Sequence, residues 1–289
     1  MDFPSPHELL TNGRRLVAKG PVALIFVEDA IEIASTLRHH AALGFREVIA
    51  FAPAAIPAPD EVSGLAHWVT CDTHAPGAVR ATVNAVIAAA PAGTWFYYGY
   101  NAEYLFFPFS ETRTVGELLA FHAEERRDAM LASVIDLYAP DLGRHPDAVS
   151  LAEAMFDRSG YSALPRHDPE TGAVLERQHD LFGGLRWRFE EHVPWERRRI
   201  DRVALFRAAP GLALREDHTF STEEYNTGEC PWHRNLTAAV LSFRAAKALK
   251  SNPGSTYDIR SFLWQHSTPF EWRAQQLLDL GIIEPGQWF

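Results

Sequence analysis

Cysteine is scarce in this 289-residue chain, which has only Cys71 and Cys230, far apart in sequence. So few thiols exclude a disulfide framework as the basis of the fold, and they favour a reducing cytoplasm. Long apolar runs are missing too, since none approaches the roughly 18–20 residues of a membrane-spanning helix. The segment Met1 to Pro6 lacks the basic and apolar regions of a signal peptide. We therefore expect a cytoplasmic protein without a membrane span.

Positive charge is also in deficit. The chain has 27 Lys and Arg against 37 Asp and Glu, which gives a formal net charge of −10. Because an acidic surface repels phosphates, nucleic acid is not an expected partner. Hydrophobic residues make up 47% of the chain, which is enough to bury a full core. The eight Trp suit stacking on a sugar or a nucleotide, and they suit a packed core at least as well.

Short apolar segments alternate with helical patterns through the first 140 residues. Strands are expected at 22–27, 47–51, 66–71, 94–98 and 129–138, and helices at 31–41 and 79–87. Thr114 to Glu117 forms a capping box that predicts a further helix. This order predicts an α/β fold with a mostly parallel sheet flanked by helices. Ligands bind such sheets outside the carboxyl ends of the strands.

The second half of the chain is less regular. The sequence predicts a short helix at 152–156, a polar loop at 166–179, a helix at 236–249, and a last helix at 270–280 that Gly281 ends. No repeat or clear linker divides the chain. We therefore expect one domain over 1–289, with a core at about 20–250 and a C-terminal helical extension at 251–289.

The stretch that follows the fourth expected strand, Tyr100-Asn101-Ala102-Glu103-Tyr104-Leu105, carries a family resemblance. It resembles a strand end of family 2-like glycosyltransferases of the GT-A fold, especially in a bacterial branch. Those proteins have Asp-x-Asp-Glu-Phe-Leu there, and the two aspartates hold a divalent cation that bridges the donor diphosphate. Tyr100 and Ala102 stand at the two Asp positions, so the resemblance does not extend to a bound Mg²⁺ or Mn²⁺.

Further motifs of the same family follow in order over roughly residues 20–250. They are Glu28-Asp29, His40, Leu43-Gly44-Phe45, Asp136-Leu137-Tyr138, the segment Gly183-Gly184-Leu185-Arg186-Trp187-Arg188, the expected strand at 202–206, and Asp217-His218. Two motifs depart from the pattern. Residues 52–57 replace the family's nucleotide loop, and Leu241-Ser242-Phe243-Arg244 lacks the His of a His-Phe-Lys step.

The resemblance implies transfer of a sugar, in the manner of a hexosyltransferase, from a nucleotide-sugar donor to a carbohydrate-type acceptor. The implied donor-site residues lie at the carboxyl ends of the first and fourth strands: Glu28, Asp29, Tyr100, Asn101 and Glu103. Arg186 and Arg188 would face the diphosphate, because the neighbouring glycines permit close backbone approach. The carboxylates of Glu103, Asp136 and Asp217 are the candidate bases, and His218 is a candidate substrate ligand.

Ordinary structural roles compete with each of these assignments. Seven arginines between Arg186 and Arg207 interleave with acidic residues, so most of them suit a solvated salt-bridge face. Glu28-Asp29 suits a helix start, and a lone His such as His218 is more often a structural hydrogen-bonding group. Cys230 and His233 have the spacing of half a zinc site, but no second such pair accompanies them.

Two other functions stay open. One is a catalytically inactive GT-A-fold binding or assembly module with a protein partner, favoured by the missing aspartates, nucleotide loop and late His. The other is a metal-dependent enzyme with a rearranged site formed by Glu103, Asp136 and His218. That site requires the three side chains to converge on one cation.

Overall fold

The computed structural model describes residues 1–228 and 235–288, so Cys230 and His233 lie outside the described residues. The chain divides into two compact units. Unit 1 comprises Met1–Tyr104, Thr112–Leu131 and Val203–Asn226, and unit 2 comprises Leu105–Glu111, Ala132–Arg202 and Thr227–Phe289. The α/β class predicted from the sequence is confirmed, with a mixed, mostly parallel sheet flanked by helices.

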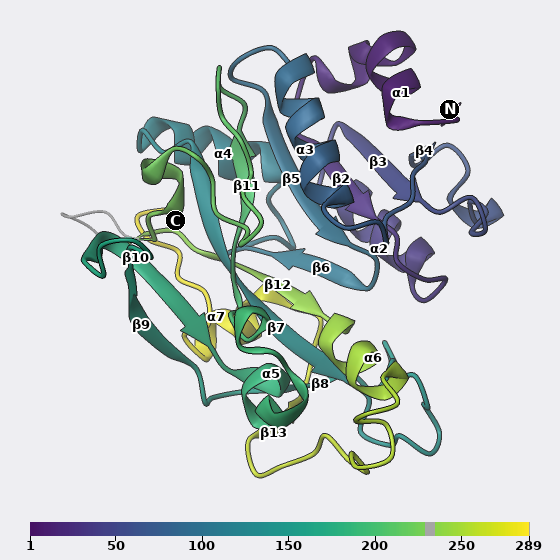
Figure 1. Cartoon of the computed structure of the whole chain (residues 1–289), viewed down its shortest axis with the longest axis vertical. Coiled ribbons are helices and arrows are strands. Elements are labelled where there is room, and N and C mark those ends of the chain that lie inside the picture. Colours follow the sequence, from purple (N-terminus) through teal and green to yellow (C-terminus); the bar gives the residue numbers. More distant parts are fainter. Residues whose placement is uncertain (229–234, 289) are drawn as a thin grey trace. The chain divides into compact units, whose positions relative to one another are not determined.

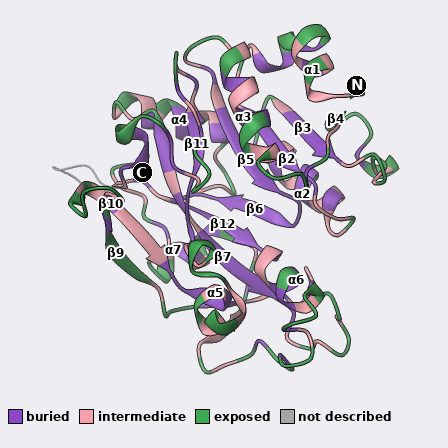
Figure 2. Cartoon of the chain, viewed as in Figure 1, coloured by how far each residue is buried: buried purple, intermediate pink, exposed green. Residues whose placement is uncertain are grey.

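The sheet of unit 1 is built from strands that pair mainly in parallel (Figure 1). Its strand order is β1 (Asp2–Phe3), β4 (His67–Thr70), β3 (Glu47–Ala52), β2 (Val22–Phe26), β5 (Trp95–Tyr100) and β11 (Asp201–Arg207). Only β11 in this series is antiparallel, where it pairs with β5. Every residue of β2 is buried, as expected for a parallel strand covered on both faces (Figure 2).

Helices cover both faces of this sheet. The helical segments of unit 1 are α1 (Pro6–Asn12), α2 (Ile33–Ala42), α3 (Ala78–Ala89) and α4 (Val115–Glu124), with 3₁₀ turns η1 (Arg14–Val17), η2 (Asp60–Val62) and η5 (Glu223–Asn226). On α3, Val83 joins the core cluster that contains Tyr98. On α2, His40 packs on Tyr97, with 4.8 Å between ring centroids. Because neighbouring strand residues point to opposite faces, α2 and α3 cover opposite sides of β5.

Unit 2 holds most of the remaining strands. They are β6 (Glu103–Phe106) and β7 (Ala129–Tyr138), whose first residues lie in unit 1, and β8 (Met155–Asp157), β9 (Ser162–His167), β10 (Val174–Phe182), β12 (Ala238–Ser242) and β13 (Ser267–Pro269). Strand β12 lies beside β7 in parallel, β8 pairs antiparallel with β7 and β13, and β9 and β10 form a hairpin. The helical segments are α5 (Gly184–Arg188), α6 (Arg244–Ser251), α7 (Ala274–Asp279), η3 (Glu190–His192) and η4 (Trp195–Arg197).

The elements expected in the first half are confirmed within one or two residues at most ends. The capping box is present, since the backbone N–H of Thr114 donates to Glu117 Oε2 over 2.7 Å and the backbone N–H of Glu117 donates to Thr114 Oγ1 over 3.3 Å. Gly44, just beyond α2, has the left-handed φ of 84° that suits a helix end. No helix in the described part of the chain is long and apolar enough to cross a membrane.

Four expectations for the second half were wrong. The segment 152–156 contains no helix, because Phe156 is buried in strand β8 and pairs with Leu137 of β7. The polar loop at 166–179 is a hairpin, in which Arg166 contacts Asp180 of the partner strand. The helix at 236–249 is replaced by β12 and the shorter α6. The last helix, α7, begins only at Ala274.

Burial explains these differences. All five residues of β12 are buried beside β7, so an apolar run that suits a helix is used as a parallel strand. Phe270 lies outside α7 because its ring packs against Phe106 and Phe156, with centroid separations of 5.3 and 5.6 Å. Gly281, with φ of 67°, follows α7 as expected. The residues expected as a C-terminal helical extension, 251–289, hold β13 and α7 and belong to unit 2.

Candidate functional site

The carboxyl ends of the parallel strands of unit 1 meet at one edge. Phe26, the last residue of β2, lies beside Phe51 of β3 and Tyr100 of β5. Glu28 and Asp29 therefore follow β2 at the same edge where the turn 100–103 follows β5. The structure thus brings together five residues that the sequence assigned to a donor site: Glu28, Asp29, Tyr100, Asn101 and Glu103.

Asn101 links the loop after β2 to the end of β5. Its Oδ1 accepts the backbone N–H of Glu28 over 2.8 Å. Its Nδ2 donates to Asp29 Oδ1 over 2.7 Å and to the backbone carbonyl of Ile31 over 2.8 Å. The Asn101 side chain is completely buried. An amide is required here because the site needs one acceptor and two donors, and a carboxylate supplies no donor at neutral pH.

Glu103 closes the turn between β5 and β6. Its Oε2 accepts the backbone N–H of Tyr100 over 3.0 Å, and the residue is 1% exposed. Ala102 adopts a positive φ of 59°, and its N–H donates to Thr36 Oγ1 of α2 over 2.8 Å. In this structure the carboxylate of Glu103 holds the turn and is shielded from solvent.

His40 of α2 lies in the same buried region. Its Nδ1 is 2.9 Å from the backbone carbonyl of Thr36, whereas its buried Nε2 has no hydrogen-bond partner. Burial lowers the pKa of His40 to about 3, with a further contribution from neighbouring His39, so the imidazole is neutral at physiological pH. His40 therefore acts as a packing residue against Tyr97. The sequence analysis missed Thr36, because nothing in its helical spacing indicates a link to Ala102.

Asp217 and His218 lie on the loop after β11, also in unit 1. Asp217 is exposed, and its Oδ1 accepts the backbone N–H and the hydroxyl of Thr219 over 3.1 and 2.7 Å. His218 has a positive φ of 66°, and its Nδ1 lies 3.0 Å from the hydroxyl of Tyr98. Of the three carboxylates assigned to catalysis, only that of Asp217 is exposed to solvent.

Asp136 is a buried carboxyl group near the end of β7 in unit 2. Its Oδ2 accepts the backbone N–H of Leu185 over 2.9 Å, and its Oδ1 has no hydrogen-bond partner. Arg186 Nε is 3.7 Å from Oδ1. Burial raises the pKa of Asp136 to about 6 despite the opposing charge of Arg186, and Asp157 adds to the rise. The structure thus places Asp136 beside Arg186, but the Asp136 side chain is 0% exposed.

Arg188, the other arginine of α5, is held by three hydrogen bonds. Its Nε donates to Asp157 Oδ2 over 2.9 Å, and its Nη2 donates to Asp157 Oδ1 and to the Phe262 carbonyl over 3.2 and 2.8 Å. Asp157 Oδ1 also accepts from the Tyr138 hydroxyl and from Trp264 Nε1. The sequence analysis missed Asp157, because it lies next to a segment interpreted as a helix. Arg188 is therefore positioned as a structural cation.

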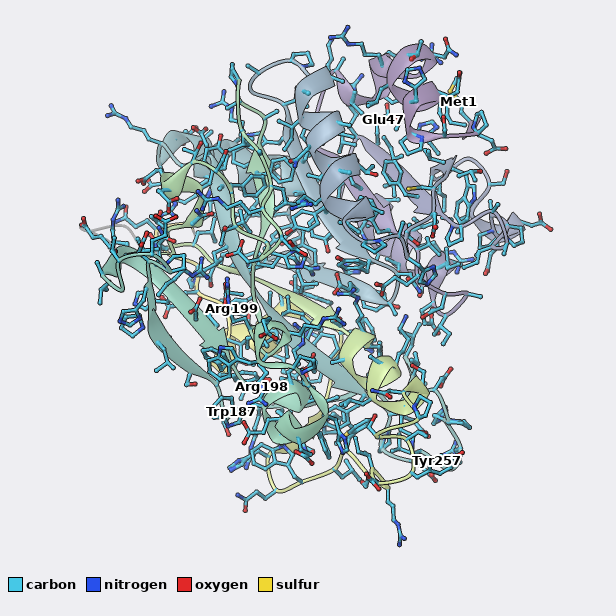
Figure 3. The ribbon with its side chains drawn as sticks, in the orientation of Figure 1. Met1, Glu47, Trp187, Arg198, Arg199 and Tyr257 are labelled. Atoms are coloured by element: carbon cyan, nitrogen blue, oxygen red, sulfur yellow. The ribbon has the colours of Figure 1, made fainter. Side chains whose placement is uncertain are left out.

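Several of the remaining arginines bear out the salt-bridge interpretation. Arg198 pairs with Glu190 at 2.7 Å and Arg207 with Asp128 at 3.0 Å. Arg199 contacts both Asp180 and Asp201. Figure 3 labels Arg198 and Arg199 among the side chains of unit 2. Glu190 and Asp201 are interleaved acids that the sequence predicts as partners, whereas Asp128 and Asp180 lie outside the arginine-rich segment.

A rearranged metal site does not form within the described residues. In residues 1–228 and 235–288, no group of three or more His, Cys, Asp or Glu side chains could hold a metal ion. The hypothesis that Glu103, Asp136 and His218 share one cation therefore finds no support in the geometry. Comparison with known proteins adds no relative, since no family model matches this chain and no curated protein sequence matches it.

Proposed function

We propose that this protein is a glycosyltransferase-like enzyme of the GT-A type that binds a nucleotide sugar. In this proposal residues 100–103 hold no metal ion. The observation that carries the proposal is the clamp by Asn101. It fixes the Glu28–Asp29 loop at the carboxyl edge of the parallel strands, where ligands bind in open α/β sheets. A loop that is already ordered loses little entropy when a ligand binds.

The roles of the donor-site residues follow from their exposure. Glu28 and Asp29 are partly exposed at this edge, so their carboxylates suit the hydroxyls of a ribose or a sugar ring. Asp29 Oδ1 already accepts from Asn101 and from the backbone N–H of Ile31, which orients this carboxylate. An uncharged hydroxyl donor suits this acidic edge better than a phosphate does.

The roles of the charged groups differ from those that the family resemblance implies. Asp217 is the best candidate for the base, because the carboxylates of Glu103 and Asp136 are shielded from solvent. Of the two arginines of α5 that the resemblance assigns to the diphosphate, Arg186 is the less engaged by neighbouring groups. Arg188 is bound on both edges by Asp157 and Phe262, whereas Arg186 has one carboxylate at 3.7 Å and donates one hydrogen bond to the Arg199 carbonyl.

Ligand-induced thermal stabilisation tests the donor site. Nucleotide sugars such as UDP-glucose and GDP-mannose should raise the Tm in the presence of EDTA, because binding at 100 times Kd adds about 2.7 kcal/mol to the folded state. The variant Glu28→Gln should weaken this effect, and the exposed control Asp60→Asn should leave it unchanged. If no nucleotide or nucleotide sugar stabilises the protein, the donor-site proposal is wrong.

A second candidate is a catalytically inactive module of the same fold that binds a partner protein. It is favoured by the burial of Asn101 and Glu103, which serve the turn rather than a reaction. Release of nucleotide from the donor, measured with EDTA, Mg²⁺ or Mn²⁺, separates the two candidates. Nucleotide binding without turnover would support the inactive module. Turnover that is lost in Asp217→Asn but retained in Asp60→Asn would rule it out.

A further inference from the structure

A pocket of about 510 Å³ lies at the opposite edge of unit 1, at the amino ends of the parallel strands. Glu47, the first residue of β3, and His67, the first residue of β4, both line it. Met1 and Glu47 mark its position in Figure 3. The pocket is thus separated by the length of the strands from the carboxyl edge that holds Glu28 and Asp29.

Three cations line this pocket without a carboxylate partner. Arg15 of η1, Lys19 in the loop before β2, and Arg46 just before β3 are all exposed, and no ion pair engages them within the described chain. Arg15 Nη2 donates a long hydrogen bond, 3.7 Å, to the sulfur of Met1. Some exposed arginines elsewhere pair with acids, as Arg144 does with Glu153, and others, such as Arg14, do not pair with any acid among the described residues. What distinguishes Arg15, Lys19 and Arg46 is that all three line one pocket, in a chain with a net charge of −10.

The single acidic residue of the lining leaves this positive charge largely intact. Glu47 Oε2 lies 2.9 Å from His67 Nε2, so its carboxylate is already engaged on one side. The buried Nδ1 of His67 has no hydrogen-bond partner. Three cations against one carboxylate leave an excess of about two positive charges, which attracts an anion of matching charge.

The size and the remaining lining indicate what kind of anion fits. A volume of about 510 Å³ is that of a site for an organic ligand, far more than one phosphate fills. Leu16 and Ala18 contribute apolar wall. Arginine pairs with phosphate through two parallel hydrogen bonds, and lysine adds a point charge. We propose that this pocket binds a phosphorylated organic molecule of nucleotide size, at a site separate from the donor site.

Calorimetric titration with AMP, adenosine and inorganic pyrophosphate tests the proposal. AMP should bind, adenosine should bind at least tenfold more weakly, and pyrophosphate alone should bind more weakly than AMP because it leaves the apolar wall uncovered. Because each substitution removes a charged hydrogen-bond donor, Arg15→Gln and Arg46→Gln should each weaken AMP binding by about tenfold or more. Pyrophosphate binding as tight as that of AMP would overturn the claim that the ligand is organic.

Arg14→Gln is the matched control. Arg14 lies on the same 3₁₀ turn as Arg15 and is also exposed, but it does not line the pocket, and its Nε donates to the carbonyl of Ala89. This variant should bind AMP as the unaltered protein does. An equal loss in Arg14→Gln and Arg15→Gln would show a non-specific charge effect and overturn the proposal, as would AMP binding that survives the triple variant of Arg15, Lys19 and Arg46 to Gln.

Discussion

Asn101 Nδ2 donates to Asp29 Oδ1 over 2.7 Å, and through this bond the end of β5 holds the loop that follows β2. In the glycosyltransferase resemblance inferred from the sequence, a metal-binding aspartate would stand on each side of this position. Here the amide has a structural role, because it donates to Asp29 Oδ1 and to the backbone carbonyl of Ile31 and accepts the backbone N–H of Glu28. The turn at residues 100–103 therefore holds the loop after β2 in place at the candidate donor site.

Replacement of Asn101 by Asp should destabilise the protein strongly. The new carboxylate would face Asp29 Oδ1 and the Ile31 carbonyl, both acceptors, in a completely buried position. Loss of the donor together with this repulsion should lower the free energy of unfolding by about 2–4 kcal/mol in urea denaturation. The exposed control Asn12→Asp should cost less than about 1 kcal/mol. Similar losses in both variants would contradict the clamp.

The buried carboxyl of Asp136 should make stability depend on pH. Its pKa is raised from 3.8 to about 6 in the folded protein, so the folded state retains a proton that the unfolded state has released. The contribution to stability is therefore full below pH 3.8 and is lost as pH rises through 6. At about 1.4 kcal/mol for each pH unit, the loss amounts to about 3 kcal/mol.

Comparison with Asp136→Asn isolates this effect. Burial lowers the pKa of His40 to about 3 and the pKa of His122 to about 4, so both histidines destabilise the folded state as pH falls. In the plot of unfolding free energy against pH for the unaltered protein, this loss opposes the gain from Asp136. The difference in unfolding free energy between Asp136→Asn and the unaltered protein cancels the histidine contributions. We expect that difference to move in favour of the variant by up to about 3 kcal/mol between pH 4 and pH 7. A constant difference would show that Asp136 is ionised throughout.

Gly184 should not tolerate a side chain. It has a positive φ of 64°, and an added Cβ would lie 2.8 Å from Asp136 Oδ2. Gly184→Ala should lower the unfolding free energy by about 2–4 kcal/mol, since backbone strain and steric overlap add. Gly172→Ala is the matched control, with φ of 69° and no atom near the added Cβ, and it should cost only the strain of about 1 kcal/mol. Equal losses of unfolding free energy in Gly184→Ala and Gly172→Ala would mean that the Asp136 side chain moves away readily.

The pair formed by Arg188 and Asp157 should be among the most sensitive to mutation in unit 2. Both side chains are largely buried, with 15% and 2% exposure, and Arg188→Ala would leave the carboxylate of Asp157 uncompensated. We expect a loss of about 3–5 kcal/mol in unfolding free energy. Arg38→Ala, which removes an exposed pair with Glu61, should cost at most about 1 kcal/mol. If Arg188→Ala is as mild as Arg38→Ala, Arg188 is available for a ligand.

Local features of the sequence determined the first half of the fold. The apolar run of β2, the helical spacing of α3 and the capping box at Thr114 each act over a few residues, so their patterns are legible without the rest of the chain. The order of these elements also predicts a parallel sheet, and with it the edge where Glu28 and Asn101 come together.

Only the tertiary structure decided which elements form in the second half of the chain, and which candidate site residues are buried or bound to neighbours. Strand β12 is a strand because it is buried beside β7, a neighbour about 100 residues earlier in the chain. Arg188 donates hydrogen bonds to Asp157, 31 residues away, and Asn101 donates to Asp29, 72 residues away. Hydrogen bonds and burial at such separations arise from packing, so no local pattern reveals which carboxylates are exposed and which are enclosed.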